Sequence, residues 1–197
     1  MEYEAHMSLP YVLQAQFLAE RLGSSVEYFQ PGSVGVLGAS GGNGFEVFQK
    51  YPGTDVCAVD INPVYLRELK RRYSGKIPRL SMCACDLSSE IWPLPQFGLL
   101  YAALILEYLP LVPSMRNLSR HLATEGRLFV IVQMASEVPE VTPSPYQSLG
   151  SLAHAMRLVD PVELFSIATS VGLAIESKQV HQPAGDKRFL EVIFRRG

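Results

Sequence analysis

The segment Gly32-Ser-Val-Gly-Val-Leu-Gly-Ala-Ser-Gly-Gly-Asn-Gly44 joins a short apolar stretch to a cluster of glycines. We expect a strand over residues 32–37, a glycine-rich turn, and then a helix over residues 45–51 that ends at Pro52-Gly53. This order places backbone N–H groups and the positive end of a helix dipole at one point, where a nucleotide can bind. Glycine clusters also occur in purely structural turns, because glycine adopts positive φ at little cost. The residues further along the chain help to separate these two interpretations.

Amphipathic helices and apolar strands alternate around this segment. The further helices are expected over residues 11–22 with Gly23 as the stop, from Pro63 onward with Asn62 as the cap, and over 114–123 and 160–170. The further strands are expected over residues 55–59, 79–85, 96–106 and 127–133. Such an alternation is typical of a parallel sheet with helices on both faces. Two last strands, over residues 173–180 and 188–194, are too close in sequence for a helical crossover and must form an antiparallel hairpin. The sequence therefore predicts one α/β domain over residues 1–197, with a doubly wound, mostly parallel seven-stranded sheet and a C-terminal antiparallel hairpin.

Two aspartates follow the strands next to the glycine turn. Asp60 ends the second strand, about 20 residues beyond the turn, where a carboxylate can accept both hydroxyls of a ribose. Asp86 ends the third strand beside the same crevice, where it can accept the exocyclic amine of an adenine, with Leu87 packing next to it. Asp86 also precedes a plausible first turn of a helix, so a capping role stays open, and both roles can hold. Together with the strand context, Asp60 favours nucleoside binding over a structural turn.

Three motifs in this order resemble motifs I, II and III of the class I S-adenosylmethionine-dependent methyltransferases. They are residues 34–44, Val59-Asp60 and Cys85-Asp86-Leu87. Residues 99–109 resemble the fourth strand of that family and the helix start behind it, and the closing hairpin resembles its strands six and seven. The resemblance covers about residues 31–197 and implies a Rossmann-like fold, S-adenosyl-L-methionine as cofactor, and methyl transfer.

The resemblance also implies which residues bind the cofactor. They are Gly38, Ala39, Ser40, Gly42, Asn43 and Gly44 on the methionine side, Asp60 with Ile61 at the ribose, Asp86 and Leu87 at the adenine, and Ala102, Ala103 and Leu104 under the sulfonium. This sequence departs from the family pattern at two positions. Val36 stands where the family usually carries an acidic residue, and Ser40 stands where the motif more often has glycine.

Glu107 and Tyr108, directly after the fourth strand, are the candidate catalytic residues. Glu107 could orient or deprotonate a hydroxyl or amine of the substrate, and it could equally be a surface glutamate of a helix. A sulfonium is already a strong methyl donor, so most of the catalysis comes from positioning the acceptor, and a general base is optional. We therefore expect methyl transfer to an oxygen or nitrogen acceptor with or without a base.

Substrate-binding residues are expected on the segments that cover the strand ends. One is the N-terminal segment, residues 1–30, with Tyr3 and Tyr11, and the other is the long connection over residues 134–159, with Tyr146 and His154. A connection of that length in a compact domain suggests a lid. An aromatic and apolar cover favours a small organic substrate over a nucleic acid.

The composition excludes several classes of protein. The chain has 197 residues, and its 17 Lys and Arg against 19 Asp and Glu argue against a dedicated nucleic-acid binder. The basic residues after the second strand, among them Arg72, are interpreted as a solvated face. No apolar run approaches the ~20 residues of a membrane-spanning helix. The N-terminus is acidic, so we expect no secretory signal. Three cysteines fit a reducing, cytoplasmic location, and no His or Cys spacing suggests a metal site.

Two other functions stay open. The chain could be a non-catalytic module with a degenerate methyltransferase fold, weakened at Val36, that binds S-adenosylmethionine or a partner protein. It could also be an NAD(P)-dependent oxidoreductase, which would share the glycine turn and Asp60. That third function is disfavoured by the spacing of the glycines, since a dinucleotide fold prefers a regular G-x-G-x-x-G pattern.

Overall fold

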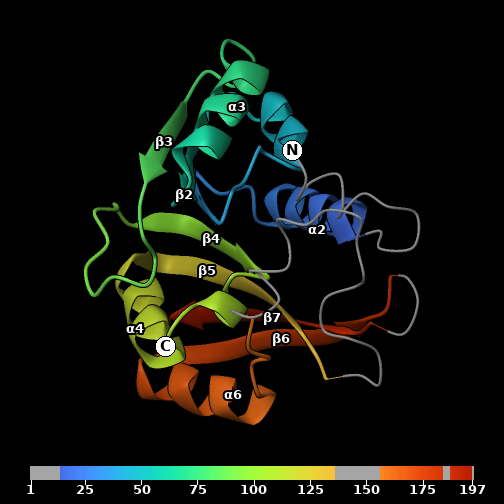
Figure 1. Ribbon diagram of the computed structural model, residues 1–197, viewed down its shortest axis with the longest axis vertical. Helices are drawn as coiled ribbons and strands as arrows, with labels where there is room; N and C mark the ends of the chain where they lie inside the picture. The colour runs from blue at the N-terminus through green and yellow to red at the C-terminus, as the bar shows by residue number, and fades with distance from the viewer. Residues whose placement is uncertain (1–13, 136–155, 184–186, 197) are drawn as a thin grey trace.

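A seven-stranded sheet forms the centre of the computed structural model, which describes residues 14–135, 156–183 and 187–196 (Figure 1). The strands are β1 (Ser33–Leu37), β2 (Asp55–Asp60), β3 (Leu80–Ala84), β4 (Phe97–Ala103), β5 (Leu122–Gln133), β6 (Leu173–His181) and β7 (Phe189–Arg196). Their order across the sheet is β3-β2-β1-β4-β5-β7-β6. The pairs from β3 to β5 are parallel, and β7 pairs antiparallel with both β5 and β6. The predicted α/β class, the mostly parallel seven-stranded sheet and the antiparallel hairpin are confirmed.

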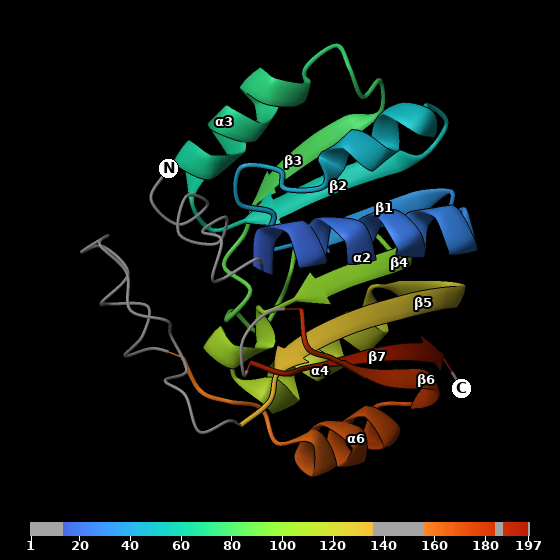
Figure 2. The same cartoon turned by 90° about the vertical axis from the view of Figure 1, so that its right-hand side faces the viewer.

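Helices cover both faces of the sheet. The first face carries α2 (Gln14–Phe29), the 3₁₀ helix η1 (Phe45–Lys50) and α3 (Pro63–Tyr73), and the second carries α4 (Leu111–Arg120) and α6 (Pro161–Ser170). Figure 2 shows α2 lying across the front of the sheet while α4 lies behind it. A short 3₁₀ turn, η2 (Leu106–Tyr108), follows β4. None of the helices in the described ranges is long and apolar enough to cross a membrane.

The alternation of side chains along the strands divides the core into two. In β1, Val34 and Val36 pack with α2, η1 and α3, whereas Leu37 packs on the side of α4 and α6. Four of the five β1 residues are buried, as expected for a strand covered on both faces. A Cβ at Gly35 would lie 2.9 Å from the side chains of Leu100 and Phe97, so any larger residue there would displace them.

Several element boundaries differ from the predicted ones. Gly23 was expected to end the first helix, but α2 continues to Phe29. No heavy atom lies within 4 Å of a Cβ built on Gly23, and the buried side chain of Val26 keeps the later turns against the sheet. The helix expected over residues 45–51 is the shorter 3₁₀ helix η1. Tertiary packing decides these boundaries, which local propensity alone does not determine.

The cap predicted for α3 is present. The side chain of Asn62 accepts a hydrogen bond from Val64 N at 2.9 Å, and Pro63 occupies the first turn. This cap fixes where α3 begins, immediately after Asp60 at the end of β2.

Candidate functional site

Two cavities meet at the carboxyl ends of the parallel strands. The chain order reverses here, because β1 has β2 on one side and β4 on the other, and such a point is where open α/β sheets bind ligands. The first cavity, of about 240 Å³, lies between residues 38–44 (the glycine loop) and α2, and we call it the loop cavity. The second, of about 320 Å³, lies beside β2 and β3, and we call it the aspartate cavity. Gly38 lines both cavities.

The lining residues come from distant parts of the chain. The loop cavity is lined by Ala15, Leu18, Leu22, Val36, Leu37, Gly38, Ala39, Ser40, Gly42, Asn43, Gly44, Glu46, Arg72, Tyr73, Tyr101 and Ala103. The aspartate cavity is lined by Gly38, Asp60, Ile61, Cys85, Asp86, Leu87, Ser88, Ile105, Tyr108 and Leu109.

The glycine loop is held in shape by left-handed backbone conformations and by close packing. Four of its residues have positive φ: 70° at Gly38, 48° at Ser40, 89° at Gly42 and 81° at Gly44. A Cβ on Gly42 would lie 2.7 Å from the ring of Tyr73, so no side chain fits there. The N–H groups of Gly38 and of the next residue both donate to Val59 O, which ties the start of the loop to β2.

Asp60 is the polar centre of the aspartate cavity. It is only 8% exposed, and its Oδ2 accepts from Ser40 N and its Oδ1 from Asn62 N, each at 2.8 Å. Burial raises the pKa of this carboxyl, and the two N–H donors oppose that effect. Each carboxylate oxygen has a second lone pair, so Asp60 can also accept hydrogen bonds from a ligand.

Asp86 also lines the aspartate cavity. Its Oδ1 accepts from both the hydroxyl and the backbone N–H of Ser88, at 2.7 and 2.8 Å, and these bonds lower the pKa of Asp86. Asp86 was predicted to cap a helix, but the residues after it form a tight turn, and Asp86 caps that turn instead. Its second predicted role stays compatible with the structure, because Asp86 lines the cavity as well. Ile61, 65% exposed, and Leu87 add apolar surface to the lining of this cavity.

The two candidate catalytic residues point in different directions. Glu107 is 1% exposed, lines neither cavity, and its Oε1 accepts from Gln133 N at 2.8 Å. Burial raises the pKa of Glu107 to about 7. Tyr108 lines the aspartate cavity, and its burial together with the nearby charge of Glu107 raises its pKa to about 12. Glu107 therefore secures the end of β5, while Tyr108 is presented to a ligand.

The end of β4 presents one side chain to the loop cavity. Ala103 lines that cavity, whereas Ala102 is fully buried in the core on the α4 side. Neighbouring residues of a strand point to opposite faces, so the two alanines cannot share a cavity. Leu104, with φ of 52°, lines neither cavity and donates its N–H to Ile131 O at 2.8 Å. Of the three residues expected under a sulfonium, the structure thus brings only Ala103 to the loop cavity.

Proteins of known structure share this architecture. The glycopeptide N-methyltransferase MtfA, solved with S-adenosyl-L-methionine, matches with a TM-score of 0.70 at 16% identity, over 91% of this chain and 94% of that chain. The N-methyltransferase NodS from Bradyrhizobium japonicum WM9 matches with a TM-score of 0.65 at 18% identity, over 96% of this chain and 98% of that chain. A TehB-like S-adenosylmethionine-dependent methyltransferase from Corynebacterium glutamicum matches with a TM-score of 0.65 at 17% identity, over 94% of this chain and 99% of that chain. This chain has the methyltransferase fold. No protein-family model and no curated protein matches its sequence significantly.

Within the methyltransferase fold, most of the predicted cofactor residues come together. All six predicted loop residues line the loop cavity, and all four predicted at the ribose and adenine line the aspartate cavity. Asn43 also donates from Nδ2 to Ala15 O at 2.7 Å, which joins the loop to α2. Tyr3, Tyr11, Tyr146 and His154 lie outside the described residues, as do most of the proposed lid over residues 134–159 and the first part of residues 1–30. The described ranges contain no group of three or more His, Cys, Asp or Glu residues that could hold a metal ion.

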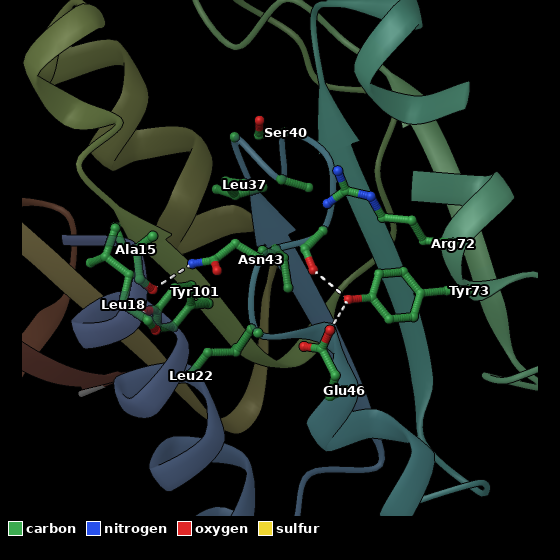
Figure 3. A pocket seen from close by; sticks show the side chains of 16 residues that line it. Ala15, Leu18, Leu22, Leu37, Ser40, Asn43, Glu46, Arg72, Tyr73 and Tyr101 are labelled. Atoms are coloured by element: carbon green, nitrogen blue, oxygen red, sulfur yellow. Dashed lines mark hydrogen bonds between the residues drawn. The ribbon is translucent and has the colours of Figure 1, made fainter. Parts of the chain in front are cut away.

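Sequence reasoning missed several residues that the methyltransferase fold brings to the loop cavity. Arg72 was assigned to a solvated face, but its Nη1 donates to Gly41 O at 3.1 Å and its side chain lines the cavity. Figure 3 shows Arg72 and Tyr73 reaching the loop from one side, opposite the residues of α2. Glu46 and Tyr101 complete this part of the wall. The buried stripe of α3, which includes Tyr73, was the one local signal that this helix packs against the loop.

Proposed function

We propose that this protein is an S-adenosylmethionine-dependent methyltransferase that methylates an oxygen or nitrogen of a small organic molecule. The observation that carries the proposal is the pair of cavities joined at Gly38, one with two carboxylates and one with a glycine loop. The methyltransferase fold supports it, and two of the similar proteins, MtfA and NodS, are named as N-methyltransferases.

The residues of the aspartate cavity fit the nucleoside part of this cofactor. Asp60 retains acceptor capacity for ribose hydroxyls after binding two backbone N–H groups. Ile61 and Leu87 offer apolar surface to a planar base, and Asp86 offers an acceptor for its amine. A Cβ on Gly38 would lie 3.1 Å from the Ile105 side chain and would narrow the space between the two cavities. Because glycine has no side chain, that space stays open to a ligand that extends from one cavity into the other.

The residues of the loop cavity fit the remainder of the cofactor. The Oγ of Ser40 is buried and has no hydrogen-bond partner among the described residues, so it can serve a ligand in this cavity. When bound, the cofactor supplies a methyl group on a sulfonium. The chain then needs chiefly to hold the acceptor in line with that group, an effect that can lower the barrier by about 7–11 kcal/mol.

Glu107 and Tyr108 remain our candidates at the reaction end of the site, with different roles. Glu107 acts as a positioning residue, since its bond to Gln133 N fixes the end of β5 beside β4. Tyr108, whose pKa is raised to about 12, is protonated at neutral pH as tyrosines ordinarily are, so it can donate a hydrogen bond to a ligand. The substrate residues Tyr3, Tyr11, Tyr146 and His154 remain proposals on the sequence evidence alone.

We place the protein in the cytoplasm with a small-molecule substrate. Its three cysteines, Cys57, Cys83 and Cys85, are all free, which suits a reducing compartment. The net charge of −2 supports a substrate other than nucleic acid.

Calorimetric titration with S-adenosylhomocysteine tests the proposal directly. We expect binding, and no binding of NAD under the same conditions. Absence of heat and of a thermal shift at millimolar S-adenosylhomocysteine would overturn the proposal, and preferential binding of NAD would favour an oxidoreductase. Binding without methyl transfer to any of a broad panel of amines, hydroxyl compounds and carboxylates would favour the non-catalytic module.

The variant Asp60→Ala locates the ribose. We expect it to weaken S-adenosylhomocysteine binding by about 1.5–3 kcal/mol, or roughly 10- to 150-fold, the size of hydrogen bonds to a charged group. Asp55→Ala is the matched control, because Asp55 lies at the other end of β2 and pairs on the surface with Arg79. Unchanged affinity in Asp60→Ala would show that Asp60 is not the ribose acceptor.

A further inference from the structure

The loop cavity carries two opposite charges. Among its described lining residues, Glu46 is the acidic one and Arg72 the basic one. Glu46 comes from η1, which directly follows the glycine loop, and Arg72 comes from α3, from which it donates to Gly41 O of that loop. The other lining residues are apolar or neutral, so the cavity has the character expected of a site for a ligand with both charges.

The contacts of Arg72 with described residues orient it toward the loop. Its Nε donates to Glu68 Oε1 at 2.8 Å from the same helix, and its Nη1 donates to Gly41 O at 3.1 Å. The guanidinium has five N–H donors in a rigid fork that matches a carboxylate. Its side chain is about two-thirds buried, so the charge is held beside the loop rather than extended into solvent.

Glu46 is oriented by Tyr73. The hydroxyl of Tyr73 lies 2.5 Å from Glu46 Oε1 and 2.9 Å from Gly42 O, so its one proton is shared between the carboxylate and the loop. Figure 3 shows Tyr73 between Arg72 and Glu46 on the same side of the cavity. Val36, on the wall at the end of β1, contributes no charge, so Glu46 is the carboxylate available to a cationic group in this cavity.

The geometry points to Arg72 and Glu46 as the residues that bind the amino-acid end of the cofactor, Arg72 its α-carboxylate and Glu46 its α-ammonium. This assignment rests on the proposed function. With the nucleoside in the aspartate cavity, the molecule can continue past Gly38, which lines both cavities, into the loop cavity. Its far end is a zwitterion, and the loop cavity offers one group of each sign.

Two ligands separate this assignment from nucleoside binding. S-adenosylhomocysteine has the amino-acid end, and 5′-methylthioadenosine has the same nucleoside and thioether without it. We expect the native protein to bind S-adenosylhomocysteine more tightly in calorimetry. Arg72→Gln and Glu46→Gln should each lower the affinity for S-adenosylhomocysteine at least 10-fold and change the affinity for 5′-methylthioadenosine less than 2-fold.

Further variants and analogues make the test specific. Arg71→Gln is the matched control, because Arg71 also pairs with Glu68 but does not line the cavity, and we expect no change. Arg72→Lys keeps the positive charge but lacks the forked guanidinium. Its affinity for S-adenosylhomocysteine should lie between those of the native protein and Arg72→Gln. Decarboxylated S-adenosylhomocysteine lacks the carboxylate and keeps the ammonium group. Its affinity should therefore be unchanged in Arg72→Gln and lowered in Glu46→Gln.

The outcomes distinguish this assignment from the proposed function. Native affinity for S-adenosylhomocysteine in Arg72→Gln and Glu46→Gln would overturn the assignment and leave the methyltransferase proposal intact. An equal loss of both ligands in these variants would also overturn it, since that result indicates a collapsed loop. Binding of neither ligand by the native protein would overturn both.

Discussion

Glu107 carries a carboxyl group that folding removes almost completely from water. One of its oxygens accepts from Gln133 N, and the other, Oε2, is buried without a hydrogen-bond partner among the described residues. Burial disfavours the ionised form, so the pKa rises to about 7, whereas the unfolded chain ionises this group near its ordinary value. The folded state therefore binds a proton that the unfolded state releases between those two values.

Stability should consequently depend on pH through this residue. Below the ordinary pKa of a glutamate both states are protonated, so the stabilising contribution is fully present, and it is lost as the pH rises toward about 7. We expect Glu107 to lower the free energy of unfolding by up to about 3 kcal/mol between pH 4.5 and pH 7.5. Urea unfolding of Glu107→Gln at both pH values should lack this part of the difference.

An exposed glutamate provides the control for that measurement. Glu90→Gln should retain the pH dependence of the native protein, because Glu90 is exposed. An identical pH dependence in Glu107→Gln and the native protein would contradict the expected effect of burial.

At the scale of elements, the glycine loop depends on two separate requirements of its backbone. Gly44 has φ of 81°, and a Cβ there would also lie 2.8 Å from the main-chain Cα of Ala19 in α2. Gly75 has nearly the same φ, 80°, but a Cβ there meets nothing within 4 Å. The two glycines therefore differ in steric contact and agree in backbone strain.

This difference predicts the cost of adding a methyl group at each position. Gly75→Ala should cost about 1–2 kcal/mol of unfolding free energy, the strain of a left-handed residue. Gly44→Ala should cost at least about 3 kcal/mol, because α2 must also move away from the loop. Urea denaturation measures both values. Equal costs in the two variants would show that contact with α2 contributes nothing.

Elements that follow from local patterns were predictable, and those set by distant packing were not. The apolar run of β1, the cap at Asn62, Asp60 at the end of β2 and Asp86 shortly after β3 all belong to short segments of the chain. The structure places the two aspartates in one cavity, as predicted. The continuation of α2 beyond Gly23 depends on burial of Val26 against the sheet, which no local pattern reveals. The role of Arg72 in the cavity was not predicted for the same reason. Its position there depends on how α3 packs against residues about 30 positions earlier in the chain.

At the scale of the whole molecule, an ion pair joins the first described helix to the last strand. Arg21 of α2 donates to Glu191 of β7 from Nε at 2.6 Å and from Nη2 at 2.9 Å. Their side chains are 26% and 6% exposed, so this pair is largely removed from water. His181 Nε2 lies 3.2 Å from the same carboxylate and connects β6 to the pair.

Breaking one side of this pair should cost more than removing both sides. Arg21→Met leaves the Glu191 carboxylate buried without its main partner, and we expect a loss of about 2–4 kcal/mol in the free energy of unfolding. The double variant with Glu191→Met should recover a large part of that loss, because the unpaired charge is gone. Urea unfolding of the four proteins of this cycle measures the coupling.

The exposed pair of Lys50 and Glu27 serves as the control. Both of its side chains are at least half exposed, and Lys50→Met should change the free energy of unfolding by less than about 0.5 kcal/mol. A zero coupling energy between Arg21 and Glu191 would contradict the expected role of their ion pair.

The position of β7 between β5 and β6 has a consequence for how the chain is made. β5 ends at Gln133, but the strand that pairs with its outer side begins only at Phe189. A ribosome-bound chain that has completed β5 therefore presents an unpaired row of N–H and C=O groups along one of its most apolar strands. Such an edge is a template for intermolecular pairing. We expect nascent or refolding chains that lack β7 to aggregate, and chaperones that shield strand edges to raise the yield of native protein.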